Sequence, residues 1–365
     1  MPDRRSWPIG RWVPERLGLR RRLVGVSLCA LLALFHARNG QSQNAPPTLE
    51  QYLRTIGLGA HDLETAVSGR PVTKLLSVAS DNDLAVFGMI GVRASQESVV
   101  THLLDLDQLL AANGRRFHIF HDPPTLADVR EAAFSESGYR ELRDCRPGHC
   151  AFKLPAAAME VFVRQIDWSA PDVKAQVDQR MRHDLLELVA DYTRRGNGAT
   201  LPYDDVHGVR PGDVFVQLSA QAPEFYDYAP DLKRFLTTYP SGRPEGVRDY
   251  LYWAEDRTSL LRPTFTLNHL AIYVPPAGEA SGTVLIATKQ VYASHYFEGA
   301  FGLLGIVRAN PAGKEGITYI LIARRTRLDR LPSNLRGRAR AQLTGAARAD
   351  LERYRSLLEP RTPKP

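Results

Sequence analysis

The chain has 365 residues, with 44% hydrophobic and 24% charged residues, ordinary values for a globular protein that buries one large core or two modest ones. Its formal charge is +7, but eight arginines and only two acidic residues precede residue 43. The remaining chain is almost neutral, with 39 Lys and Arg against 38 Asp and Glu. A near-neutral body has no general field to concentrate polyanions, so we exclude nucleic acid as a partner.

Residues 1–42 are predicted to form a signal peptide. The basic run Arg20–Arg22 is followed at once by 13 mostly apolar residues, Leu23–Phe35. This pattern is typical of secretion signals, and the apolar run is shorter than the ~20 residues of a membrane span. Gly40–Ser42 provides a small-x-small cleavage site, and an uncleaved anchor is the alternative. We therefore expect a periplasmic or secreted protein.

Two cysteines remain outside that segment, Cys145 and Cys150 in the sequence CRPGHC. An oxidising compartment favours a disulfide, and the Pro-Gly turn between the two cysteines brings the ends of the loop together. A redox pair and a metal site with His149 are the alternatives, but four residues between the cysteines fit neither pattern. The sequence therefore predicts a structural disulfide.

The first half of the chain mixes helices with two strands. Residues 43–80 are expected to form a linker and a helix, residues 81–122 two strands and a helix, and residues 123–248 a helical insertion with the disulfide loop. Apolar content and helical periodicity define these elements. The predicted elements are a helix at Thr48–Ile56, a strand at Leu84–Val92, a helix at Gln96–Leu110, a strand at Phe117–Phe120, and helices at Asp128–Leu142, Ala156–Ile166 and Asp172–Arg194.

Residues 249–359 change to strands separated by short turns, the pattern of an antiparallel meander. A long helix rich in Arg, Ala and Leu closes the chain, and its arginines suggest peripheral contact with acidic lipids as an alternative to a solvated flank. The predicted elements are strands at Asp249–Glu255 and Pro263–Val274, two strands within Thr283–Arg308, a strand at Gly316–Arg324, and a helix at Asn334–Leu358.

This order resembles the helix-grip fold of the START and polyketide-cyclase-like superfamily. The resemblance rests on the strand, turn and helix of Val86–Leu109 and on the meander and helix of Tyr250–Leu358, about half of the mature chain. It implies an α+β protein in which a curved antiparallel sheet wraps a long C-terminal helix around a cavity, here with a helical insertion. The chain also resembles exported bacterial proteins with no assigned activity, which share the C-x-x-x-x-C loop and a KQVYASHYF-like stretch.

Such a cavity would take a hydrophobic small molecule or lipid. Strand alternation places Tyr292, Ser294 and Tyr296 on one face, and Lys289, Val291 and His295 on the other. Asn268 and His269 point to opposite faces of the neighbouring strand, and Trp253 adds aromatic surface. The candidate ligand-binding residues are Tyr292, Tyr296, Ser294, His295, Lys289, His269 and Trp253.

An enzyme of the same compartment is the alternative, with acid-base chemistry from His295 and Tyr292 or from His269 and Glu255. A third hypothesis is a non-catalytic envelope protein that docks through its insertion. We expect no cofactor and no metal site. The two metal-like clusters have simpler explanations, because the histidines of the first would face opposite sides of a strand and the second has turn-capping acids. These clusters are His118, His121 and Asp122, and Asp204, Asp205 and His207.

Overall fold

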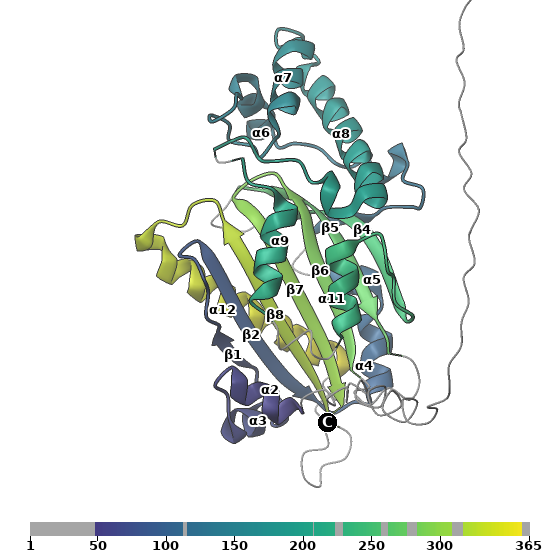
Figure 1. Cartoon of the computed structure of the whole chain (residues 1–365), viewed down its shortest axis with the longest axis vertical. Coiled ribbons are helices and arrows are strands. Elements are labelled where there is room, and N and C mark those ends of the chain that lie inside the picture. Colours follow the sequence, from purple (N-terminus) through teal and green to yellow (C-terminus); the bar gives the residue numbers. More distant parts are fainter. Residues whose placement is uncertain are drawn as a thin grey trace, which may run out of the picture. The chain divides into compact units, whose positions relative to one another are not determined.

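Eight antiparallel strands form one sheet at the centre of the fold (Figure 1). The computed structural model describes residues 48–111, 115–206, 208–222, 229–256, 262–275, 283–308 and 317–359, so the predicted signal peptide and His207 lie outside it. The spatial order of the strands is β1-β2-β8-β7-β6-β5-β4-β3. The strands are β1 (Val72–Leu75), β2 (Asp83–Val92), β3 (Arg116–Ile119), β4 (Val247–Asp256), β5 (Thr264–Tyr273), β6 (Val284–Ala293), β7 (Phe297–Arg308) and β8 (Thr318–Leu328).

Helices cover both faces of this sheet, and most of them come from the predicted insertion. Their bounds are α2 (Leu49–Thr55), α3 (Ala60–Val67), α4 (Gln96–Leu103), α5 (Leu106–Leu110), α6 (Glu136–Glu141), α7 (Ala156–Gln165), α8 (Val173–Arg195), α9 (Pro211–Ala220), α11 (Pro230–Thr238) and α12 (Ser333–Leu358), with the short 3-10 helices η2 (Leu126–Val129), η3 (Leu142–Asp144) and η4 (Gly196–Ala199).

The two-sided cover explains why β2 is almost entirely apolar and why even the polar residues of β5 are buried. All ten residues of each strand are buried. In β2, Phe87 and Met89 face the core under α2, α8, α9 and α11, whereas Val86 and Ile90 face the core under α12 and α4. A strand buried on both faces reads as a continuous apolar run instead of alternating. Figure 1 shows α9 and α11 crossing one face of the sheet and α12 lying behind it.

The long helix α12 packs against β1, β2 and α4. Its residues Ala347, Leu351 and Tyr354 are buried against the apolar side chains of the sheet, including Val86, Ile322 and Leu304. The space predicted to be a cavity between the sheet and the last helix is therefore filled by a hydrophobic core. Among the described residues, none of the helices combines the length and apolar character that crossing a bilayer requires.

The single helix predicted over Gln96–Leu110 is two helices. It breaks at Leu104, after which the side chain of Asp105 accepts a hydrogen bond from Gln108 N–H at 3.1 Å and begins α5. Aspartate is a preferred N-cap because its carboxylate satisfies a free amide of the first turn. Asp105 therefore has a local structural role.

Candidate functional site

An open cleft of about 570 Å³ lies on the insertion side of the sheet. Its walls are α7 and α8, and its floor comes from the start of β5 and the end of β6 through Phe265, Val291, Tyr292 and Ser294. Apolar side chains dominate the lining, which is typical of sites for small hydrophobic ligands. These include Phe134, Leu154, Val161, Phe162, Leu185 and Leu188.

A β-bulge brings the floor residues together. The pairing of β5 with β6 shifts between Leu267 and Asn268, so that Leu267 pairs with Tyr292 and Asn268 pairs with Gln290. Val291 is the extra residue, and in a bulge two residues on one strand oppose one residue on its partner. Both Val291 and Tyr292 therefore line the cleft. The predicted separation of Tyr292 from Val291 onto opposite faces is wrong, because strict alternation stops at this bulge.

Tyr292 sits at the back of the cleft against Tyr203. Their rings meet edge to face with centroids 6.0 Å apart, and Tyr203 Oη accepts a hydrogen bond from Ala293 N–H at 3.0 Å. Burial raises the pKa of Tyr292, with a further contribution from the nearby carboxylate of Asp184. The phenol is therefore a neutral hydrogen-bonding group in an otherwise apolar wall.

Charged side chains of α8 stand at the rim of the cleft. Arg180 pairs with Asp184 one turn along the helix, and burial raises the pKa of Asp184 while the guanidinium opposes that shift. The Nε–H of Arg180 is buried, and among the described residues it has no hydrogen-bond partner. An unpaired buried donor is costly, so this edge of Arg180 favours a ligand that carries an acceptor oxygen.

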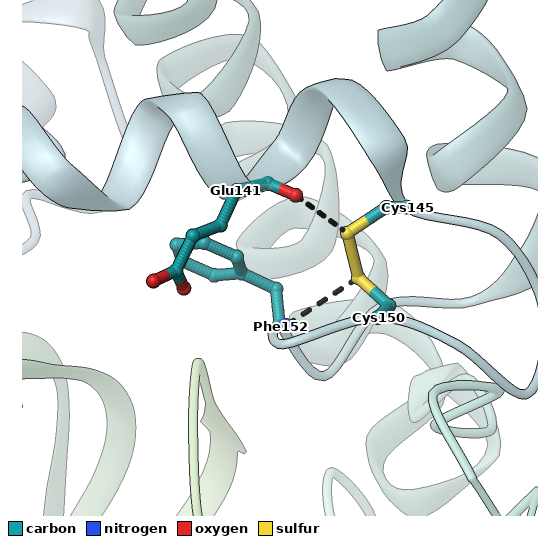
Figure 2. The surroundings of a disulfide bond; sticks show 4 residues. All are labelled: Glu141, Cys145, Cys150 and Phe152. Atoms are coloured by element: carbon teal, nitrogen blue, oxygen red, sulfur yellow. Dashed lines mark hydrogen bonds between the residues drawn. A yellow bond between two sulfur atoms is a disulfide. The ribbon is translucent and has the colours of Figure 1, made fainter.

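The disulfide loop supports the cleft from the side. Cys145 and Cys150 are bonded, as predicted, and Figure 2 shows the bond beside Glu141 and Phe152. Phe152 N–H donates to Cys150 Sγ at 3.4 Å, and its ring packs on Phe134, a cleft residue, at 4.9 Å. The loop thereby holds Phe152 in a small core that also contains the cleft residues Phe162 and Leu154.

His295 lies just behind the cleft floor. Its Nδ1 is 2.8 Å from Ser294 Oγ, its ring packs on Phe152 at 4.3 Å, and burial lowers its pKa to about 4. Ser294 Oγ also accepts from Phe265 N–H at 3.0 Å. The structure thus pairs His295 with Ser294 instead of Tyr292. Tyr296 follows in the turn before β7 with φ 58°, and its hydroxyl accepts from Arg262 N–H at 3.3 Å.

Lys289 and His269 belong to a buried polar chain on the same face of the sheet. Lys289 Nζ is 2.9 Å from Tyr192 Oη, which is 3.0 Å from His269 Nδ1, and His269 Nε2 is 3.1 Å from Asp249 Oδ2. Nζ also donates to Asn197 Oδ1 and, at 3.3 Å, to Leu236 O. The predicted pairing of His269 with Glu255 does not form. His269 hydrogen-bonds to Asp249 instead, and Glu255 accepts a hydrogen bond from Arg116.

Burial sets the protonation of this chain. Burial lowers the pKa of Lys289 to about 7 and also lowers the pKa of His269, although the hydrogen bond that His269 donates to the Asp249 carboxylate acts against the second shift. Lys289 and His269 are fully buried, so the chain is closed to solvent. Trp253 is buried as well, stacked on Phe265, with its Nε1–H donating to Asp128 O at 2.7 Å.

Of the seven predicted ligand-binding residues, Tyr292 and Ser294 line the cleft. The cleft residues of α7 and α8 were missed, because a surface helix with an ordinary apolar stripe gives no signal of a ligand. The bulge at Val291 was missed because a bulge changes spacing without changing composition.

An antiparallel sheet with helices on both faces and a long C-terminal helix defines an α+β protein, and the predicted fold class is confirmed. Two solved structures are similar over part of the chain. A START superfamily protein from Mycobacterium smegmatis is 15% identical, with a TM-score of 0.21, over 41% of this chain and 90% of that one. Ara h 8.0201 is 11% identical, with a TM-score of 0.17, over 40% and 89%. No family model matches the chain, and no curated protein is similar to it in sequence.

Proposed function

We propose that the protein binds an amphipathic small molecule or lipid in the cleft between α7, α8 and the β5–β6 floor. The observation that carries this proposal is an open apolar volume of about 570 Å³ with an unsatisfied Arg180 donor at its rim. Apolar walls supply affinity and a few polar groups fix orientation. The ligand's apolar body would lie on Val291 and Leu188, and an acceptor oxygen would meet Arg180.

Export to the periplasm or out of the cell is part of the same proposal. The basic and apolar N-terminal run of the sequence and the Cys145–Cys150 disulfide support it, since disulfides persist in oxidising compartments. A lipid carrier or sensor in the envelope would combine this location with an apolar cleft.

The test is to incubate the purified protein with a total lipid extract and identify co-eluting molecules by mass spectrometry. Two exposed alanines of the lining, Ala157 and Ala190, allow the cleft to be narrowed by Trp substitution without disturbing the core. We expect Ala190→Trp and Ala157→Trp each to weaken binding about tenfold, or roughly 1.4 kcal/mol. Ala341→Trp, at an exposed alanine of α12, is the matched control and should bind normally. Normal binding by both cleft variants would refute the proposal.

A second candidate function is hydrolysis of a bound ester. The 2.8 Å contact between Ser294 Oγ and His295 Nδ1 at the cleft floor favours it, because a hydroxyl next to a neutral imidazole is the start of a nucleophile and base pair. Ser294→Ala should abolish turnover of a bound ester and leave binding intact. If Ser294→Ala turned over the ester as fast as the wild type, Ser294 would not be the nucleophile and this second function would be refuted.

The third hypothesis, a non-catalytic envelope protein that docks to a partner through its insertion, would need an exposed apolar patch on that insertion. Exposed apolar side chains of the insertion include Leu126, Val163, Leu201 and Val216, on separate segments. Such single exposed residues are normal on protein surfaces.

A further inference from the structure

Two histidines and a buried aspartate converge at the sheet edge formed by β3. His118 Nε2 is 3.1 Å from Asp128 Oδ1, and His121 Nδ1 contacts the same oxygen. The three donor atoms lie within 4.8 Å of one another. This cluster is separate from the cleft described above, since none of its residues belongs to the cleft lining.

The end of β3 explains how both histidines reach one side. The strand stops at Ile119, and Phe120 N–H still bonds to Leu251 O at 2.9 Å, so His121 already lies beyond the regular ladder. Alternation therefore no longer separates His121 from His118. The sequence-based expectation that they face opposite sides is wrong for this reason, and the third group is Asp128 instead of the adjacent Asp122.

The two carboxylate oxygens of Asp128 have different hydrogen-bond partners. Its Oδ2 accepts from Thr125 N–H at 2.6 Å and from Thr125 Oγ1–H at 3.1 Å, which fixes its orientation. Its Oδ1 is left to the two imidazoles. Trp253 Nε1–H holds the backbone carbonyl of Asp128 at 2.7 Å and ties the η2 turn to β4. A carboxylate oriented by hydrogen bonds on one oxygen is the outer-shell support that metal ligands ordinarily have.

Accessibility differs across the cluster in the way a metal site with an open position requires. The Asp128 side chain is fully buried, whereas the side chains of His118 and His121 are 41% and 71% exposed. Exposed imidazoles can turn to present nitrogen lone pairs, and solvent can supply a further ligand.

We propose that His118, His121 and Asp128 form a binding site for a divalent transition-metal cation of the zinc class. Two imidazole nitrogens and one carboxylate oxygen suit Zn²⁺ and its neighbours, whereas Mg²⁺ and Ca²⁺ prefer oxygen ligands alone. Three protein ligands leave a coordination position for water. The site does not depend on the ligand proposed for the cleft.

A second group on α8 provides the matched control. His183, Asp184 and Glu187 also have donor atoms within 4.8 Å, but His183 and Glu187 are exposed on one helix. Arg180 orients Asp184, but within the described part of the chain no scaffold of hydrogen bonds like that around Asp128 orients His183 and Glu187. We therefore expect His183→Ala to leave tight zinc binding unchanged.

The experiment is calorimetric titration of the chelator-treated full chain with Zn²⁺, followed by Co²⁺ absorption spectra. One equivalent should bind, and His118→Ala, His121→Ala and Asp128→Asn should each weaken binding at least about tenfold. Since His121 is mostly exposed, its variant should fold normally, which circular dichroism checks. Tetrahedral Co²⁺ bands should appear in the wild type and vanish in His121→Ala.

Two results would overturn the proposal. Unchanged Zn²⁺ affinity in folded His118→Ala and His121→Ala would show that the histidines only hydrogen-bond to a capping carboxylate. Loss of binding in His183→Ala alone would place the cation on α8.

Discussion

Replacing Lys289 with methionine tests whether burial sets the protonation of the polar chain. Lys289 is fully buried on β6, with Tyr192, Asn197 and Leu236 O as its acceptors. The ring of Phe215 lies 4.6 Å from Nζ and offers further stabilisation to the ammonium form. Burial nevertheless lowers the pKa of Lys289 from 10.5 to about 7.

The sign of the effect follows from proton binding in the two states. Below about pH 7 the amine is protonated in both the folded and unfolded chains, and above pH 10.5 it is neutral in both. Between these values the unfolded chain holds a proton that the folded chain has released, so the free energy of unfolding rises with pH by about 1.4 kcal/mol per unit. The full effect, over the interval from about pH 7 to pH 10.5, is on the order of 5 kcal/mol and is absent from Lys289→Met.

Urea unfolding at several pH values measures this contribution. From about pH 7.5 to about pH 9.5, the stability of the wild type should rise by about 3 kcal/mol relative to Lys289→Met. Gln290→Met, at a buried non-titrating neighbour on β6, is the control and should follow the wild type. Parallel curves for wild type and Lys289→Met would refute the reasoning, because they would mean that the folded protein keeps the lysine protonated.

Two further predictions concern stability. Gly196, with φ 56°, ends α8 where a Cβ would lie 1.7 Å from Tyr239 O, so Gly196→Ala should cost more than about 2 kcal/mol in thermal unfolding. Gly345→Ala, in open space on α12, should instead stabilise by about 1 kcal/mol, and equal effects at both sites would contradict the packing argument. Replacing Cys145 and Cys150 together by serine should cost about 2 kcal/mol, the entropy of closing a short loop, and an unchanged midpoint in urea would show that the loop is held without the bond.

Much of the fold could be predicted because its central strands are rich in apolar residues. Leu84–Val92 and Pro263–Val274 were recognised as strands from composition alone, and they are β2 and β5 within one or two residues. Helix α8 was predicted over nearly its whole length, because its stripe from Val177 to Val189 is strictly periodic. By contrast, Asp128–Leu142 was predicted to be one helix. It consists of η2, α6 and η3, because caps at Thr125 and Ser135 start separate short turns.

The candidate sites were harder to predict because they depend on contacts between distant segments. Tyr292 was singled out correctly as a strand tyrosine, but its position at the cleft required a bulge and a helix more than 100 residues earlier. His118 and His121 were noticed, but Asp128 was hidden in a stretch that looked helical. A sequence pattern identifies residue types along a regular strand or helix. Both sites instead depend on positions where the regular strand spacing is interrupted, at the bulge in β6 and at the end of β3.

The pairing of β2 with β8 has a consequence for synthesis. Asp83 on the second strand is the register partner of Arg327 on the last, 244 residues later. During synthesis, β2 therefore waits for its partner β8 until almost the whole polypeptide has left the ribosome, and the apolar side chains on both of its faces stay exposed for that time. Such late closure is slow and prone to aggregation. A truncated chain that ends before Thr318 would lack β8, would leave one edge of β2 without a partner, and should be captured by holdase chaperones.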